Sequence, residues 1–75
     1  KRTMPQRCSA LGSYLTHLRI ENKFRQGDVA EKVGYASSMI SLIESGRKLP
    51  SHAKIKQLSD LFGVSPSEFY QRIAA

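Results

Sequence analysis

The chain has few of the residues on which small metal-binding, disulfide-bonded or catalytic domains depend. Its single cysteine, Cys8, excludes an intrachain disulfide and a four-cysteine zinc site. It contains no CxxC pair, no HExxH and no glycine-rich phosphate loop ending in Gly-Lys-Ser/Thr. Since no nucleophile, base and orienting group can be assembled from this inventory, we expect no enzyme activity, no metal ion and no cofactor.

Long hydrophobic runs and acidic residues are also scarce. No apolar run approaches the roughly 18 residues of a membrane span, so we expect no membrane association and a cytoplasmic protein. Twelve Lys and Arg outnumber six Asp and Glu, and the pI is near 9.9. Residues 1–56 carry a net charge of +7 and residues 57–75 a net charge of −1. This asymmetry indicates a surface that faces a polyanion and a separate, nearly neutral end.

Apolar residues recur at helical spacing along most of the chain, and no alternation typical of strands is present. At 75 residues we expect one all-α domain over residues 9–75, preceded by a flexible N-terminal arm over residues 1–8. The five predicted helices are Ser9 to Asn22, Gln26 to Val33, Ser37 to Ser45, a fourth after the cap Ser51 that ends at Gly63, and a fifth after the cap Ser65. Pro66 and Glu68 complete a predicted capping box for the fifth helix.

Residues 26–50 are the most informative segment. Two short amphipathic helices are joined there by a tight turn that begins at Gly34, and the second helix stops at Gly46. One face of that second helix is predicted to hold Ala36, Ile40 and Ile43, and the other Ser38, Ser41, Leu42 and Ser45. This is the construction of a helix-turn-helix, in which one helix crosses the phosphate backbone and the next lies in the major groove.

Several further residues stand at the spacings of a known family. They are Leu18-Arg19, Gln26, Ala30, Gly34, Ile40, Ile43-Glu44, Gly46, Pro50, Leu58, Gly63-Val64-Ser65 and Phe69. On these residues the chain resembles the Cro- and lambda-repressor-like (XRE-type) helix-turn-helix family from about Leu11 to Phe69. The resemblance implies a compact five-helix DNA-binding domain that works as a homodimer on a two-fold symmetric operator in double-stranded DNA.

The resemblance also implies roles for individual positions. Ser37, Ser38, Ser41 and Leu42 match the positions whose side chains reach base edges. Gln26 matches a glutamine that contacts phosphate at the start of the second helix, where backbone N–H groups favour an anion. Arg19 and Glu44 match a pair that forms an internal salt bridge between the first and third helices.

Two departures from the family pattern concern helix caps. Arg25 and Ala36 stand where the family usually has a capping Ser or Thr. Each missing cap costs about 1 kcal/mol of stability. Asp28 and Ser37 are expected to compensate in part, and a cap at Ser37 would move the start of the third helix by one residue.

Affinity is expected to come from groups that reach phosphates. Besides Gln26, the candidates are Arg25, Tyr35, Arg47 and Lys48, with Lys54, Lys56 and the arm residues Arg2 and Arg7 as weaker ones. The alternative for each is an ordinary solvated side chain. Because the base-edge candidates are short, we expect modest direct readout, with DNA shape and phosphate placement carrying much of the selectivity.

The function predicted from these features is a sequence-specific transcriptional regulator of double-stranded DNA, a repressor, acting as a homodimer. Phe69, Tyr70 and Ile73 are the candidates for the dimer surface, because the fifth helix looks too short to bury all three. The alternative is a protein-interaction module, antitoxin-like or coactivator-like, that uses the helix pair as a scaffold. RNA binding is a third reading, disfavoured because exposed aromatic residues in a groove are missing.

Overall fold

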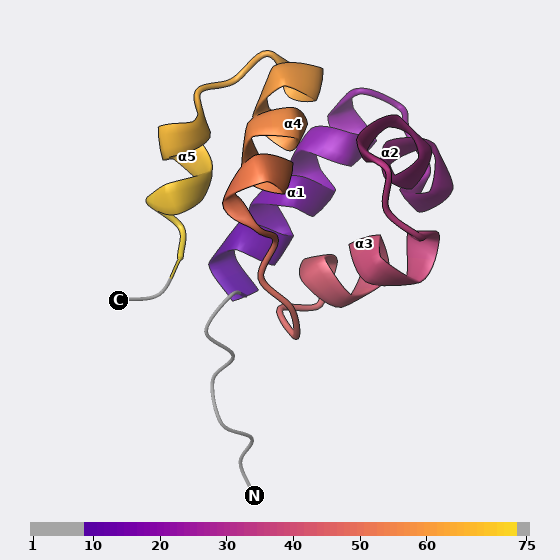
Figure 1. Cartoon of the computed structure of the whole chain (residues 1–75), viewed down its shortest axis with the longest axis horizontal. Helices are drawn as coiled ribbons and strands as arrows, with labels where there is room; N and C mark the ends of the chain where they lie inside the picture. The colour runs from indigo at the N-terminus through magenta and orange to yellow at the C-terminus, as the bar shows by residue number, and fades with distance from the viewer. Residues whose placement is uncertain (1–8, 74–75) are drawn as a thin grey trace, which may run out of the picture.

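The computed structural model describes residues 9–73, except for the side chain of Ser9, and over that range it contains five helices and no strand (Figure 1). They are α1 (Ser9–Glu21), α2 (Gln26–Val33), α3 (Ser37–Glu44), α4 (His52–Phe62) and α5 (Pro66–Tyr70). This confirms the all-α, five-helix fold. The predicted arm, with Arg2, Arg7 and Cys8, lies outside the described residues. None of the helices described is long and apolar enough to cross a membrane.

Two helices end one residue earlier than predicted. After α1, the Asn22 side chain donates to the Leu18 carbonyl at 2.8 Å, and Lys23 adopts a left-handed φ of 61°. The amide therefore competes with the next helical turn, and the chain leaves the helix at Glu21. After α3, Ser45 is the C-cap, and its hydroxyl donates to the Leu42 carbonyl at 2.9 Å.

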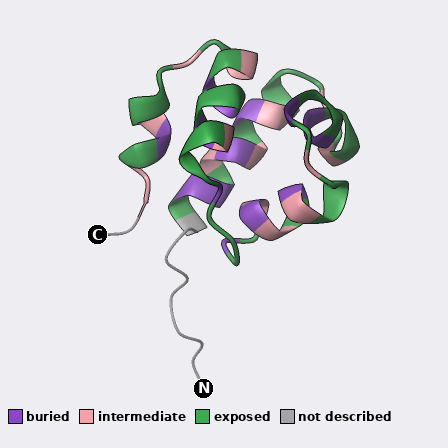
Figure 2. Ribbon diagram, in the orientation of Figure 1, coloured by how far each residue is buried: buried purple, intermediate pink, exposed green. Residues whose placement is uncertain are grey.

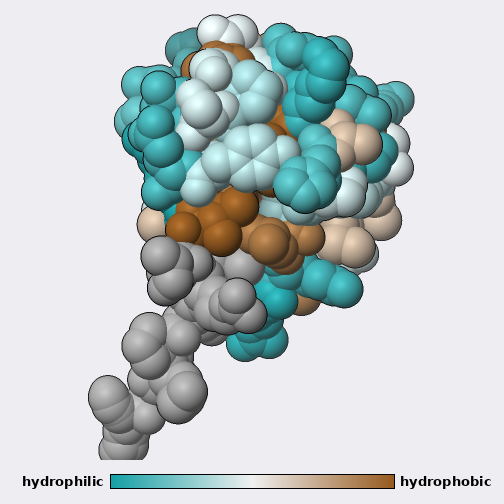
Figure 3. Space-filling model, turned by 60° about the vertical axis from the view of Figure 1, so that its left-hand side comes forward, coloured by the Kyte–Doolittle hydropathy of each residue, from teal (hydrophilic) through white to brown (hydrophobic). Residues whose placement is uncertain are grey.

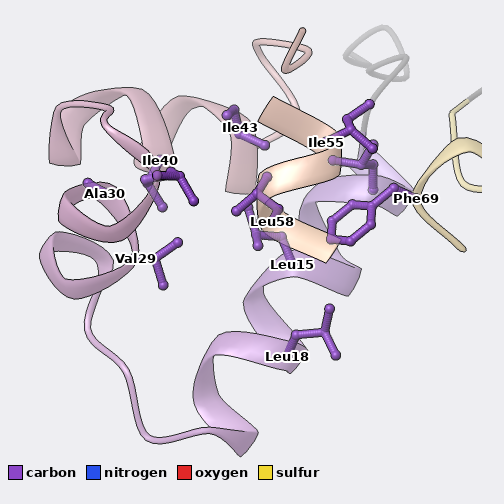
Figure 4. Packing of buried hydrophobic residues seen from close by; sticks show 11 residues of the cluster. Leu15, Leu18, Val29, Ala30, Ile40, Ile43, Ile55, Leu58 and Phe69 are labelled. Atoms are coloured by element: carbon purple, nitrogen blue, oxygen red, sulfur yellow. The ribbon is translucent and has the colours of Figure 1, made fainter. Parts of the chain in front are cut away.

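One hydrophobic cluster holds all five helices together. Its buried members are Leu11, Leu15, Leu18, Val29, Ala30, Val33, Ile40, Ile43, Ile55, Leu58 and Phe69. Figure 4 shows Leu15, Ile55, Leu58 and Phe69 converging from α1, α4 and α5, with Val29 and Ile40 meeting on the α2–α3 side. Figure 2 shows that the buried residues lie on the inward sides of the helices. The predicted helical stripes therefore form the core.

The structure corrects the assignment of Phe69 to a dimer surface. Phe69 is completely buried, and its ring meets Tyr14 of α1 edge-on at a centroid distance of 5.2 Å. The guanidinium group of Arg72 lies over the Tyr14 ring, with its central carbon 3.9 Å from the ring centroid. Phe69 therefore attaches α5 to α1 within one chain, and only Tyr70 and Ile73 remain as candidates for a contact between copies.

The two C-terminal helices begin largely as predicted. Ser51 caps α4 by accepting the Lys54 N–H at 3.3 Å, and Gly63 ends that helix with φ 70°. At α5, the Ser65 hydroxyl accepts from the Ser67 N–H at 3.3 Å. The Glu68 carboxylate accepts a hydrogen bond from the Arg72 guanidinium at 3.2 Å and not from the Ser65 N–H, so the predicted capping box is incomplete.

Candidate nucleic-acid interface

The turn between α2 and α3 depends on Gly34. Its φ of 74° and ψ of 29° lie in the left-handed region, which glycine adopts without steric cost. The N–H groups of Gly34 and Tyr35 both donate to the Ala30 carbonyl, the latter at 2.9 Å. This closes α2 and redirects the chain, so that α3 starts only three residues later.

The two missing caps have different outcomes. At α2, the Asp28 carboxylate accepts the N–H of Arg25 at 2.9 Å, which confirms the predicted compensation. At α3, Ala36 is the N-cap in an extended conformation with no side-chain cap, and Ser37 is the first helical residue. The predicted compensation by Ser37 was therefore wrong, and α3 is not shifted by one residue.

The two faces of α3 differ sharply in exposure. Ile40 and Ile43 are buried in the core, and Met39 packs against it. The opposite face carries Ser37, Ser38 and Ser41, which are exposed, and Leu42, which is half-buried. Ala36 was predicted to lie on the buried face, but it is exposed. The outward surface of α3 is therefore made mostly of small hydroxyl side chains.

A polar network fixes the ends of α2 and α3 to α1. The Arg19 guanidinium donates to the Glu44 carboxylate at 2.6 Å and 3.2 Å, which confirms the predicted salt bridge. Arg19 also donates to the Phe24 carbonyl at 3.0 Å, just before α2. The Gln26 side-chain amide donates to Glu44 Oε1 at 3.0 Å, the oxygen that also accepts the 3.2 Å bond from Arg19. Because one carboxylate joins three helices, the first residue of α2 is held against the last residue of α3.

The loop after α3 brings positive charge beside the serine-lined surface. Gly46 is buried with φ 84°, and the N–H groups of Arg47 and Lys48 donate to the Leu42 carbonyl at 2.9 Å and 3.3 Å. The backbone of this loop is thus tied to the end of α3, while the side chains of Arg47 and Lys48 are exposed.

The candidate residues therefore gather in two separate places, with the candidates for DNA contact around α2 and α3 and the candidates for the dimer contact at α5. Arg25 and Gln26 lie at the start of α2, where Gln26 is bonded to Glu44, and Arg47 and Lys48 follow the end of α3 after two residues. Tyr70 belongs to α5, which lies on the other side of the molecule from α2 and α3 (Figure 1). Its hydroxyl is 2.6 Å from His52 Nδ1 of α4.

Two contacts at this site were not predicted from the sequence. One is the hydrogen bond from Gln26 to Glu44. The other is made by Lys54, whose Nζ donates to the Val33 carbonyl and lies 4.9 Å from the centroid of the Tyr35 ring. Both contacts join residues 18 or more positions apart. No local spacing signal identifies such pairs.

The geometry is that of a helix pair whose second member presents its polar face outward, and the comparison with protein families agrees with it. A model described as a helix-turn-helix domain matches residues 10–69. The chain belongs to the helix-turn-helix domain family. The match reaches from α1 into α5, and it confirms the resemblance to XRE-type helix-turn-helix domains rather than to an enzyme family. A search of curated protein sequences found no match.

Solved structures of helix-turn-helix proteins superpose closely on the chain. PlcR of Bacillus thuringiensis, in complex with the peptide PapR7 and DNA, matches with a TM-score of 0.79 and 25% identity over 85% of this chain and 22% of its own. The biofilm regulator SinR, in complex with DNA, matches with a TM-score of 0.73 and 28% identity over 80% of this chain and 97% of its own. The restriction-modification controller protein C.AhdI of Aeromonas hydrophila matches with a TM-score of 0.77 and 24% identity over 83% and 94%. This helix-turn-helix chain thus spans about a fifth of PlcR, and it covers 97% of the SinR chain in the DNA complex but 58% of the chain in the SinR–SinI complex.

Proposed function

We propose that this helix-turn-helix domain is a sequence-specific transcriptional regulator that binds double-stranded DNA with α3 in the major groove. The observation that carries the proposal is the outward face of α3, where Ser37, Ser38 and Ser41 are exposed opposite the buried Ile40 and Ile43. The major groove is about 12 Å wide and admits a helix, and small side chains allow the backbone of that helix to approach the base edges closely.

Phosphate contacts from the loop after α3 and from the start of α2 would hold α3 in register. Arg47 and Lys48 extend from a loop whose backbone is bonded to the end of α3. At the start of α2, Arg25 is exposed and Gln26 opens an eight-residue helix whose first N–H groups favour an anion. Since Glu44 holds Gln26 against α3, a phosphate bound at the start of α2 would fix the placement of α3.

Base readout on this proposal is modest. Serine hydroxyls serve any base edge weakly, and Leu42 offers an apolar contact for a thymine methyl group. The stronger readers of guanine and adenine, Arg, Lys, Asn and Gln, do not occur on α3. Selectivity therefore comes in large part from DNA shape and from where the phosphates lie.

Two structures in the comparison support DNA as the ligand, since PlcR and SinR are each described in complex with DNA.

We further propose that the domain acts as a repressor and as a homodimer. Occupying an operator is enough to block a promoter, so repression needs no activity beyond binding. A two-fold operator calls for an isologous contact between copies, for which the exposed Tyr70 and the half-buried Ile73 are available.

The α5 side offers exposed apolar surface for such a contact. Figure 3, in which this side is turned forward, shows a patch of hydrophobic surface on it. Tyr70 of α5 is 38% exposed, although it is a large aromatic side chain. The surface lies away from α2 and α3, so two copies could meet through it while both helix pairs remain free for DNA.

Selection of bound duplexes from a random pool, followed by a binding titration of the selected duplex, tests this function. We expect one enriched two-fold sequence, bound about a thousandfold or more tighter than random duplex. Amide NMR shifts should move at residues 37–48 when that duplex is added. Binding to no duplex, or shifts confined to other residues, would instead favour the protein-interaction module.

A further inference from the structure

Lys54 is a basic residue whose charged group is already occupied within the molecule. It lies on α4 and is half-buried, whereas Lys56 two residues later is exposed. Lys54 Nζ donates to the Val33 carbonyl of α2 and lies 3.4 Å from Gln57 Oε1. It also lies 4.9 Å from the centroid of the Tyr35 ring. The ammonium group is therefore held by two hydrogen bonds and one cation–π contact.

Two of the three partners of Lys54, Val33 and Tyr35, lie at the end of α2 and in the turn that follows it. Val33 is the last residue of that helix, so its carbonyl is one of the groups left without a helical partner. A cation there also complements the negative end of the helix dipole. Tyr35 lies one residue beyond Gly34, and a Cβ atom on Gly34 would lie 3.2 Å from Lys54 Nζ. The ammonium group therefore lies against the whole turn, Val33 to Tyr35.

We propose that Lys54 is a positioning residue for DNA binding, which fixes the turn between α2 and α3 and thereby the direction of α3. This inference rests on the proposed function. Arg19 and Gln26 hold the far end of α3 through Glu44, but its first residue follows Ala36, which provides no side-chain cap. The contact of Lys54 with Val33 and Tyr35 supplies a constraint on the turn from outside the helix pair.

This assignment differs from that of Arg47 and Lys48, which are exposed and free to reach phosphates. If Lys54 acts through the turn, removing its charge changes affinity without changing the number of phosphates neutralised. A phosphate contact would instead lower the slope of log K against log salt by about 1.

The test compares Lys54→Met with Lys56→Met. Both remove one positive charge from α4, and Met retains much of the apolar stem. Lys56 is 73% exposed and its partner is Asp60 on the same helix at 3.6 Å, so it serves as the matched control. Affinity is measured for the duplex selected by the unmodified protein, well below the unfolding midpoint of each variant, so that loss of folded protein does not contribute.

We expect Lys54→Met to weaken binding about tenfold, as does the loss of contacts to one base pair, with an unchanged salt slope. Lys56 was only a weaker phosphate candidate in the sequence, and the structure pairs its exposed ammonium with Asp60 on the same helix and not with the turn, so Lys56→Met should remain within about twofold. The amide NMR signals of Gly34 and Tyr35 should shift in the free Lys54→Met variant and not in Lys56→Met.

Lys54→Arg provides a second test that does not depend on how well the methionine variant folds. It retains the charge, but a planar guanidinium cannot direct donors to Val33, Gln57 and the Tyr35 ring as an ammonium does. We expect a loss of about threefold or more. Unchanged affinity in both Lys54 variants while folded, or a salt slope lower by about 1 in Lys54→Met, overturns this inference alone. Failure of the unmodified protein to bind any duplex overturns the proposed function with it.

Discussion

Gly12 of α1 lies directly against the backbone of Glu44 at the end of α3. A Cβ atom at position 12 would be 2.5 Å from the Glu44 carbonyl oxygen and 2.6 Å from that of Ile43. Gly12 itself is buried, and its carbonyl accepts the Thr16 hydroxyl at 2.9 Å. Since the atoms in conflict belong to backbone, a larger residue could be accommodated only by moving one helix relative to the other. The absence of a side chain at Gly12 is therefore what lets α3 pack so closely on α1.

Gly12→Ala should destabilise the domain by about 1–3 kcal/mol, as overpacking of a core does. It should also displace the end of α3 and with it the Arg19–Glu44 salt bridge. Urea unfolding measures the loss. Gly27→Ala is the control, because no atom lies within 4 Å of a Cβ there, and it should raise stability by about 0.5–1 kcal/mol. Equal effects at the two glycines would contradict the role given to the α1–α3 contact.

Replacing only one partner of the Arg19–Glu44 salt bridge should strongly lower the stability of the domain. Their side chains are only 16% and 7% exposed, and Glu44→Gln would leave the Arg19 guanidinium without its counter-charge. We expect a loss of about 3 kcal/mol or more in the free energy of unfolding. Replacing both residues by Met should cost less than the sum of the two single changes.

The control for that experiment is the exposed pair Lys56–Asp60, with side chains 73% and 69% exposed. Because water screens such a pair, Asp60→Asn should change stability by less than about 0.5 kcal/mol. A similar small effect of Glu44→Gln in denaturant unfolding would show that the Arg19–Glu44 pair does not hold α1 and α3 together.

Most of the fold could be predicted because its signals are local. Gly34 and Gly63 end helices at positions that favour a left-handed residue, and Ser51 precedes a helix whose N–H groups need an acceptor. Each signal depends on residues within one or two turns, and each is visible in the printed sequence. The salt bridge of Arg19 was predicted only through the family resemblance.

The features that were missed depend on contacts between distant segments. Gly12 looks in the sequence like a weak point in a helix, and its close approach to Glu44 depends on how α1 and α3 cross. Phe69 was assigned to the surface because α5 is short, yet α1 and α4 provide enough neighbouring surface to bury it. Lys54 reads as one more basic residue until α4 is packed beside the end of α2.

The basic loop after α3 should control the salt dependence of DNA binding. If one protomer neutralises about five phosphates, log K should fall with log salt at a slope of about −4 to −5, and twice that for a dimer. Arg47→Gln and Lys48→Gln should each reduce the slope by about 1 per protomer, with a similar loss for selected and random duplex. Fluorescence anisotropy over a range of salt measures this, with Lys56→Gln as a charge-matched control.

The serines of α3 should contribute little to discrimination between sequences. Ser38→Ala and Ser41→Ala remove one hydroxyl each and leave the helix and its flanking phosphate contacts unchanged. We expect the ratio of affinities for selected and random duplex to fall by less than about tenfold for the pair. A loss of discrimination above about 3 kcal/mol would mean that direct readout, and not shape, dominates.

The proposed dimer contact on the α5 side predicts different results for one and two half-sites. Tyr70→Glu places a charge on this surface, and the variant should be monomeric in sedimentation equilibrium at concentrations where the unmodified protein is a dimer. Affinity for a duplex with two half-sites should fall about a hundredfold, because the second binding event is no longer intramolecular, while binding to a single half-site should change little. Ile20→Glu is the control, since Ile20 is 61% exposed at the end of α1 and lies away from α5. A dimer disrupted by Ile20→Glu and not by Tyr70→Glu would place the contact on α1.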